Sequence, residues 1–481
     1  MARKATLTHD ALIALGAEKL ARLVLAEAER NAAFKKIVRA ALAGARGPEA
    51  IAALVDRRLA ALERARGFIG WEKRKAFATD LEATLATITD ELGAADPAAA
   101  GDRLLRFLAT AGGVFERVDD STGQVQEVYR EAAAALPGLT EKLGDHAKAR
   151  LADRLMPLLL ADDYGLIEQV IGAVVPLLPA SVLERFDAAL TASAGEIGPV
   201  RHESRDWERR LRLDRVIRAR QAVADRRGDV DAFILLEQER PSRLRDTLGV
   251  AERLLNAGRL REALDWVRRP SRPGSRAPDW RDPEDEAEGH DLPDVTRVRL
   301  EVRILEAMGD REAAQALRWQ TFEATLDDAM LRDLLAHLPD FAEFEVLDRA
   351  FAHAAAYPHR YRSLAFFLVW PRLDLAAKLV LDHRGIWEGR RYGALVPAAE
   401  ALEDQYPAAA TVLYRALIDD ILTRARSPAY GHAARYLARL DALAERVEPS
   451  PDMPDHAAYR AELKRAHGRK AGFWSLVNAR F

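Results

Sequence analysis

The chain has 481 residues, of which 49% are hydrophobic and 31% are charged. This balance supplies enough apolar surface for a sizeable core and excludes global disorder. Its 72 basic and 75 acidic side chains leave a net charge of -3, so no overall positive field attracts nucleic acid or an anionic membrane. The absence of cysteine excludes disulfides, zinc fingers, iron–sulfur clusters and thiol catalysis.

The N-terminus becomes polar at once, and the longest apolar stretches, 171–178 and 364–370, are far shorter than a bilayer span. We therefore expect a cytoplasmic protein without a membrane segment. From Leu12 onward, apolar residues recur at three- and four-residue steps, and Gly or Pro separates the runs. No run shows the alternation of a half-buried strand. The pattern predicts an all-α fold, with an N-terminal helical region over residues 1–136.

The segment from Asp119 to Gln124 precedes an amphipathic run. Ser121 and Gln124 have the spacing of a capping box, which predicts a helix N-terminus here. A calcium loop that begins at Asp120 is the alternative interpretation, but Val125 stands where such a loop needs glycine. We favour the helix cap.

Two later segments share a local pattern that is typical of paired helices. Gly258 and Gly309 are each followed five residues later by an alanine, Ala263 and Ala314. Glycine is expected in the interhelical turn, and alanine is expected where neighbouring helices approach closely. The spacing predicts a degenerate, tetratricopeptide-like α-solenoid over residues 137–481. A proline-rich, charged loop at 270–294 is expected to interrupt it.

No Gly-rich phosphate loop, Gly-x-Ser-x-Gly elbow or His-Glu-x-x-His helix occurs in the sequence. The adjacent acids Asp162-Asp163 and Asp419-Asp420 would point about 100° apart on a helix, which is poor geometry for a catalytic pair. We interpret them as solvated surface. The sequence therefore predicts no catalytic, metal-binding or cofactor-binding residue.

Two basic stretches leave a second function open. The arginine-rich segment 201–227 has the charge for a nucleic-acid helix, but Asp214 and Arg218 stand at i,i+4 and are expected to form an ion pair. The tail 460–477 is basic and then aromatic. Its rings, Phe473 and Trp474, could stack on bases or could cap the helix array together with Leu476. We favour the cap, with these cations facing water: Lys464, Arg465, Arg469 and Lys470.

Three local patterns carry a resemblance to a known group of proteins: Asp119 to Gly123, Gly258 to Trp266, and His467 to Phe473. The chain resembles an uncharacterised bacterial family of unknown function. The members of that family look like the helical, tetratricopeptide-like region of SWIM zinc-finger proteins. The resemblance implies a helical-repeat scaffold. It does not bring the DNA-binding zinc finger, because the chain has no cysteine ligands.

The leading hypothesis is a non-catalytic scaffold that binds a protein partner of unknown identity. The alternative is a nucleic-acid-associated factor that uses segment 201–227 and tail 460–477. An enzyme is the third possibility. It would require a pocket in which polar side chains from several helices converge.

Overall fold

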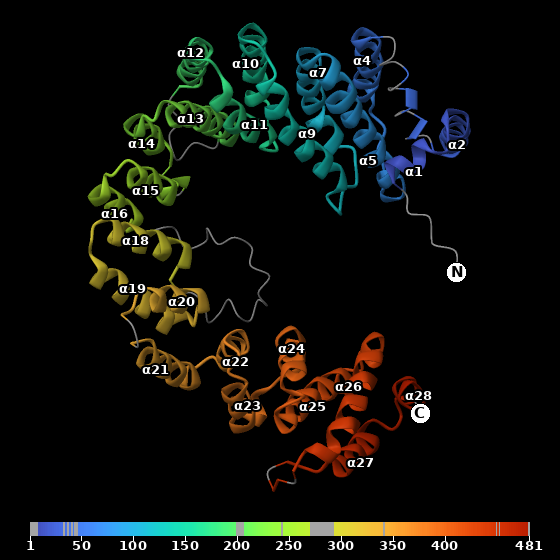
Figure 1. Cartoon of the computed structure of the whole chain (residues 1–481), viewed down its shortest axis with the longest axis vertical. Helices are drawn as coiled ribbons and strands as arrows, with labels where there is room; N and C mark the ends of the chain where they lie inside the picture. Colours follow the sequence, from blue (N-terminus) through green and yellow to red (C-terminus); the bar gives the residue numbers. More distant parts are fainter. Residues whose placement is uncertain are drawn as a thin grey trace. The chain divides into compact units, whose positions relative to one another are not determined.

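The computed structural model describes residues 8–31, 34–35, 38–39, 42, 47–198, 206–241, 244–269, 293–339, 342–448, 450–451 and 453–479. Within these ranges the fold is helical throughout and has no strand (Figure 1). Isolated bridges join Ile69 with Val118 and Ser450 with Met453. The prediction of an all-α protein is confirmed. The loop expected at 270–294 lies outside the described residues except for Pro293 and Asp294.

The chain divides into two compact units, Met1–Asp246 and Thr247–Phe481. The predicted boundary after Leu136 lies within helix α9, and Leu136 and Leu139 belong to the same hydrophobic core. The N-terminal region over residues 1–136 stays a prediction.

The described part of unit 1 consists of α-helices joined by turns, with a π-helical segment (η1) and a 3₁₀ segment (η2) between them. The elements are α1 (His9–Ile13), α2 (Ala17–Arg30), α4 (Pro48–Arg64), α5 (Trp71–Ala86), η1 (Thr87–Leu92), α6 (Gly93–Ala95), α7 (Pro97–Ala109), α8 (Ala111–Phe115), α9 (Gln124–Glu141), α10 (Asp145–Leu160), α11 (Leu166–Val174), η2 (Val175–Leu177), α12 (Ala180–Ile197), α13 (Trp207–Arg227) and α14 (Val230–Glu239).

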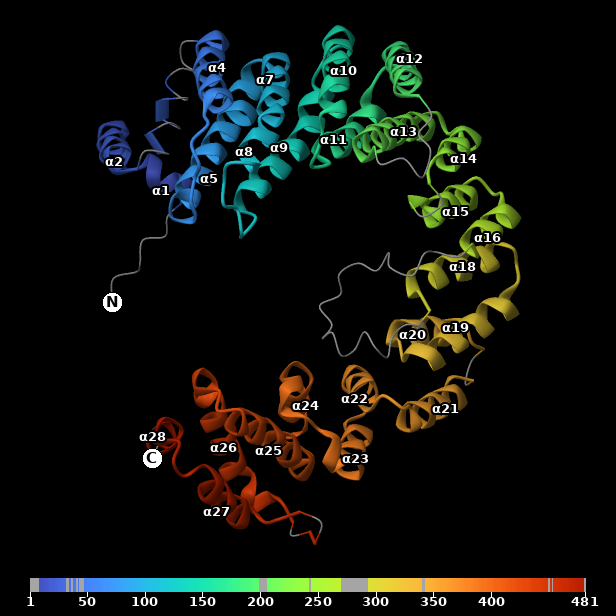
Figure 2. The same cartoon turned by 180° about the vertical axis from the view of Figure 1, so that it is seen from behind.

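If the short helices α6 and α8 are left out, most helices of unit 1 from α4 onward contact the helix two places further along the chain. One row runs through α4, α7, α10 and α12, and a second row runs through α5, α9, α11 and α13 (Figures 1 and 2). Apolar stripes from both rows form one hydrophobic core that extends from Ile51 to Val223. Each amphipathic helix is thus covered by neighbours in its own row and in the other row.

Unit 2 continues with shorter helices and several 3₁₀ segments. Its elements are α15 (Thr247–Asn256), α16 (Leu260–Val267), α18 (Val295–Ala307), α19 (Arg311–Thr325), α20 (Asp328–Ala336), α21 (Glu343–Ala356), α22 (Arg360–Val369), α23 (Leu373–Asp382), η4 (Arg384–Ile386), η5 (Gly389–Arg391), α24 (Tyr392–Leu402), α25 (Pro407–Thr423), η6 (Ser427–Ala429), α26 (Tyr430–Leu443), η7 (Ala444–Arg446), α27 (His456–His467) and α28 (Ala471–Asn478).

Consecutive helices pack in pairs in unit 2: α15 with α16, α18 with α19, and α22 with α23. Toward the C-terminus, α25 is central, because it contacts α23, α24, α26 and η5. The larger core of this unit runs from Phe322 to Val477. In the part of the chain that the structure describes, no helix is both long enough and apolar enough to cross a membrane.

The 3₁₀ segment η5 approaches α25 so closely that only glycine fits at Gly389. A Cβ atom at this position would lie 2.3 Å from the carbonyl oxygen of Ala416 and 2.9 Å from the Cα of Leu417. Neither contact is with the end of a flexible side chain, so relief requires η5 to move away from α25.

We expect Gly389→Ala to lower the free energy of unfolding by about 1–3 kcal/mol, because the added methyl group overpacks the contact between η5 and α25. Chemical denaturation followed by circular dichroism measures this change. Gly385→Ala is the matched control in the neighbouring segment η4, since a Cβ there meets no atom within 4 Å. Equal stability of the two variants would contradict the assigned contact.

Candidate functional site

The turns after α15 and α18 reverse the chain with the same backbone geometry. Gly258 and Gly309 occupy these turns with φ angles of +73° and +81°, a left-handed conformation that costs other residues about 1–2 kcal/mol. After Gly258, the amide of Arg259 donates to the carbonyl of Leu254 at 2.9 Å. After Gly309, the amide of Asp310 donates to the carbonyl of Leu305, also at 2.9 Å. Both turns are Schellman motifs, which satisfy carbonyls at the end of the first helix.

Ala263 and Ala314 lie on the second helix of each pair, five residues after the glycine. Both residues are fully buried. Since α15 packs closely on α16, and α18 on α19, these positions have little room for a larger side chain.

A third turn of the same kind lies between α13 and α14. Gly228 has a φ of +69°, and the amide of Asp229 donates to the carbonyl of Ala224 at 2.9 Å. The glycine-to-alanine spacing did not predict this turn, because buried Phe233 stands where the other two pairs have alanine. The available signal was the Gly-Asp dipeptide, which recurs at Gly309.

The aspartate of this dipeptide caps the next helix. Asp229 accepts a hydrogen bond from the amide of Ala232 at 2.9 Å, and Asp310 accepts one from Ala313 at 3.1 Å. One dipeptide therefore ends a helix with its glycine and starts the next helix with its aspartate.

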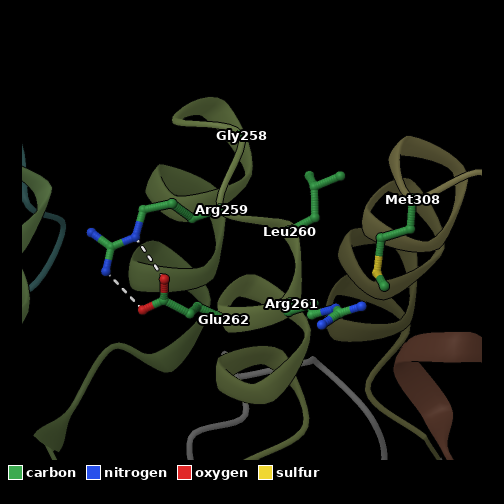
Figure 3. A pocket seen from close by; sticks show the side chains of 6 residues that line it. All are labelled: Gly258, Arg259, Leu260, Arg261, Glu262 and Met308. Atoms are coloured by element: carbon green, nitrogen blue, oxygen red, sulfur yellow. Dashed lines mark hydrogen bonds and ion pairs between the residues drawn. The ribbon is translucent and has the colours of Figure 1, made fainter.

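A shallow groove of about 440 Å³ lies beside the turn at Gly258 (Figure 3). Met308, from the turn after α18, lies across it from Leu260 and Arg261. Arg259 donates two hydrogen bonds to the carboxylate of Glu262, at 2.8 and 2.7 Å. Because this carboxylate is ion-paired and no histidine or second carboxylate lines the groove, the arrangement has no acid–base pair for catalysis.

We expect Ala263→Leu to lower the free energy of unfolding by about 1–3 kcal/mol, because the larger side chain overpacks the contact between α15 and α16. Ala307→Leu is the matched control, since Ala307 is exposed on α18. Urea denaturation of both variants measures the difference, and an unchanged midpoint for Ala263→Leu would contradict the close packing.

The helix predicted at Gln124 is present as α9, but Asp120 caps it and Ser121 does not. The two carboxylate oxygens of Asp120 accept hydrogen bonds from the amides of Val125 and Gln126, at 3.1 and 2.9 Å. The capping-box prediction at Ser121 and Gln124 is therefore wrong in its capping residue.

Backbone geometry explains this difference. Gly123 adopts a left-handed conformation directly before α9, which brings the side chain three residues earlier over the first amides of the helix. The hydroxyl of Ser121 instead accepts a hydrogen bond from Arg74, at 3.1 Å.

Asp162 repeats the arrangement of Asp120 at the start of α11. Its carboxylate accepts hydrogen bonds at 3.1, 2.8 and 3.0 Å from the amides of Leu166, Ile167 and Glu168. Gly165 before the helix is again left-handed. Asp162 is buried, so its interpretation as solvated surface is wrong. The missed signal is Asp-x-x-Gly, which occurs at residues 120–123 and again at 162–165.

The described part of the arginine-rich segment forms α13, and several of its arginines bind carboxylates inside unit 1. Buried Arg215 donates to Asp163 at 3.0 Å. Arg218 donates to Glu168 at 2.6 Å and to Asp214 at 3.1 Å. The expected pair between Asp214 and Arg218 thus forms, but it belongs to a wider network.

The network continues into α14 through buried charges. Arg240 donates to Asp214 at 2.7 Å and to Glu237 at 2.9 Å. Gln221 of α13 also donates to Glu237, at 2.5 Å. These contacts join α13 to α14, and a charge held in this way is not available to a phosphate backbone.

The C-terminal tail forms α27 and α28, and its first ring is part of the core. Phe473 is fully buried and meets Tyr430 edge to face, with ring centroids 6.1 Å apart. Trp474 is half-buried, and its indole N–H donates to the carbonyl of His467 at 3.0 Å. These contacts agree with a cap on α26 more closely than with an open stacking platform.

Leu476 does not join this cap: it is 43% exposed, and Val477 is buried instead. The expectation for Leu476 is wrong because α28 turns this residue away from α26. The four expected cations do not share one environment. Lys464, Arg465 and Arg469 are exposed, whereas Lys470 is half-buried.

We expect Phe473→Ala to lower the free energy of unfolding by about 3–5 kcal/mol, because it leaves a cavity in the contact between α26 and α28. Trp474→Ala should cost less, since that ring is only half-buried. Leu476→Ala is the exposed control. Thermal unfolding of the three variants measures the order, and a Phe473→Ala variant as stable as Leu476→Ala would exclude the cap.

A second and larger cleft, of about 640 Å³, lies in unit 2, and the sequence analysis missed it. Its floor is one face of α25, and its walls are the η4–η5 segment and residues 453–454. The lining residues are Arg384, Trp387, Glu388, Gly389, Arg390, Val412, Arg415, Ala416, Asp419, Asp420, Thr423, Arg424, Met453 and Pro454. No local motif could have revealed it, because its parts are distant in sequence.

Charges in this cleft are partly paired. Arg390 binds Glu388 at 2.5 Å, and Arg424 binds Asp420 at 3.0 Å. Asp419 accepts a hydrogen bond from the hydroxyl of Tyr459 at 2.8 Å. Asp420 thus has an arginine partner, so its interpretation as simple solvated surface is incomplete.

Local packing shifts the pKa values of two groups here. Partial desolvation raises the pKa of the Asp419 carboxyl, although the residue as a whole stays exposed. Burial lowers the pKa of the Arg415 guanidinium, and the nearby Tyr459 and Asp419 oppose that shift. A guanidinium starts so far above neutrality that Arg415 remains charged.

The described residues contain no group of three or more His, Asp or Glu side chains that could hold a metal ion. The turns, the caps and the two clefts are therefore the features from which a function can be argued.

These features define an all-helical protein of paired helices. A family model matches residues 2–476, and the chain belongs to this family, which is described as a family of unknown function (DUF6880). No curated protein matches the chain.

Proposed function

We propose that this protein is a non-catalytic scaffold that binds other proteins along a helical-repeat array. The proposed array is a degenerate, tetratricopeptide-like α-solenoid. Stacked helix pairs present an extended surface without needing a catalytic group. The protein partner is unidentified, and we propose a cytoplasmic location.

The observation that carries this proposal is the repetition of helix boundaries. Helices α9, α11 and α13 begin at residues 124, 166 and 207, so their starts lie about 42 residues apart. In unit 2, the Schellman turns at Gly258 and Gly309 repeat one backbone arrangement. Repeats of roughly 34 residues are typical of tetratricopeptide arrays, and repeats of roughly 40–47 are typical of HEAT and armadillo arrays. The helix spacing in unit 1 therefore fits the longer repeat better, and the tetratricopeptide-like part of the proposal rests on the glycine-to-alanine spacing in unit 2.

We also propose that the protein is bacterial and that its fold resembles the helical region of SWIM zinc-finger proteins. This resemblance implies a helical scaffold that lacks the zinc finger, because the sequence contains no cysteine to bind zinc.

A nucleic-acid-associated factor remains the alternative, and the exposed cations of the tail favour it. Lys464 and Arg469 are exposed on and after α27. Against it, Arg215 and Arg218 of α13 are engaged with carboxylates of unit 1. The scaffold is the better supported function.

Affinity purification of the tagged full chain from its native cells, with and without nuclease, tests the proposal. We expect defined protein partners in stoichiometric amounts after nuclease treatment. Co-purification that disappears with nuclease would support the nucleic-acid factor instead. Recovery of the tagged chain alone in both arms would contradict the scaffold.

A further inference from the structure

The larger cleft of unit 2 contains an arginine that is held in place but lacks a carboxylate partner. Arg415 is nine-tenths buried, and its Nη1 donates to the carbonyl of Pro454 at 2.8 Å. Its guanidinium lies over the ring of Tyr459, 4.6 Å from the centroid. Among the described residues, Arg415 forms no ion pair.

The three nitrogen atoms of this guanidinium differ in their hydrogen-bond partners. The protein encloses Nε without providing an acceptor, and the backbone occupies Nη1. Nη2 has no protein acceptor in the described residues, and Arg415 lines the cleft. Nη2 is thus the donor that a bound anion can reach. Because the stacked ring and the backbone carbonyl already fix the guanidinium, binding an anion would cost little side-chain entropy.

The other charges of the cleft restrict that anion to a single negative charge. Three arginines, Arg384, Arg390 and Arg424, line the cleft together with three carboxylates, Glu388, Asp419 and Asp420. These charges cancel, so Arg415 leaves an excess of one positive charge, which matches a single negative charge better than a phosphate dianion or a nucleic-acid backbone. A carboxylate carries one charge, which Arg415 can balance. The volume of about 640 Å³ lies within the roughly 300–1,000 Å³ that is usual for ligand pockets, and it exceeds the size of one side chain.

The lining also suits a peptide. Val412, Met453 and Pro454 offer apolar contact beside the charges, and exposed Thr423 adds a hydroxyl at the end of α25. A peptide segment combines backbone hydrogen-bonding groups with such mixed side chains.

We propose that this cleft binds a peptide segment of a partner protein and that Arg415 pairs with an Asp or Glu side chain of that segment. This inference rests on the proposed scaffold function and deepens it, because it names the binding surface and the chemistry of the partner.

Selection of a phage-displayed random dodecapeptide library against the full chain tests the proposal. We expect the enriched peptides to share an acidic residue. Fluorescence polarisation of a labelled synthetic copy should then show about tenfold weaker binding when that residue is changed to its amide.

Two variants test whether the peptide binds in the cleft. Arg415→Gln should weaken binding about tenfold by removing the charge that the carboxylate meets. Thr423→Glu should weaken it several-fold by adding a negative charge at an exposed position, so it tests the cleft even if Arg415→Gln fails to fold. Arg349→Gln is the matched control, because Arg349 also lies over an aromatic ring, that of Trp319 at 3.9 Å, and does not line the cleft. It should leave binding unchanged.

The proposal is overturned if no peptide is enriched, if enriched peptides lack acidic residues, or if both cleft variants bind like the wild type. Displacement of the peptide by a polyuridine oligonucleotide would overturn it in favour of nucleic acid. These outcomes can be distinguished from failure of the proposed scaffold function. If the Arg415→Gln variant still co-purifies with the native partners, the cleft is not their binding site, and the proposed scaffold function still holds.

Discussion

Several helix pairs in the described part of the chain depend on a tight reversal of the backbone at the end of the first helix. The last carbonyls of a helix need donors, and the chain must turn back within a few residues so that the apolar stripes face each other. A left-handed residue meets both needs. Gly228, Gly258 and Gly309 supply it without a steric penalty. Ala425 repeats the geometry with a φ of +51°, and the amide after it donates to Ile421 at 3.1 Å, so tertiary packing must offset the strain there.

Aspartates perform the complementary task at the beginning of helices. Asp120 and Asp162 each reach over a left-handed glycine to accept two or three amides of the following helix. Asp229 and Asp310 directly follow a Schellman glycine, and each accepts one amide of the next helix. The carboxylates also interact favourably with the positive end of the helix dipole. These acidic residues thus define helix boundaries.

Buried arginines also serve the fold, because they form ion pairs with carboxylates inside each unit. Arg215 and Arg240 are buried in unit 1 with carboxylate partners. In unit 2, buried Arg318 of α19 joins Glu306 of α18 to Asp333 of α20. Breaking such a pair leaves an uncompensated buried charge, which is costly. Arg415 departs from this pattern, since it is buried and lacks a carboxylate. The other buried arginines in the described residues are all paired with carboxylates, and this contrast supports a binding role for the larger cleft.

The sequence by itself determined the features that depend on neighbouring residues. Helical periodicity, the turn glycines Gly258 and Gly309 and the small residues Ala263 and Ala314 could all be assigned from local spacing, because a helix and its termination are set within a few residues. Tertiary structure decided which side chains those helices bury and pair. It selected Asp120 over Ser121 as a cap, placed Val477 rather than Leu476 in the core, and assembled the cleft around Arg415 from segments far apart in the chain. Local spacing cannot specify these outcomes, because each depends on contacts between helices that only packing brings together.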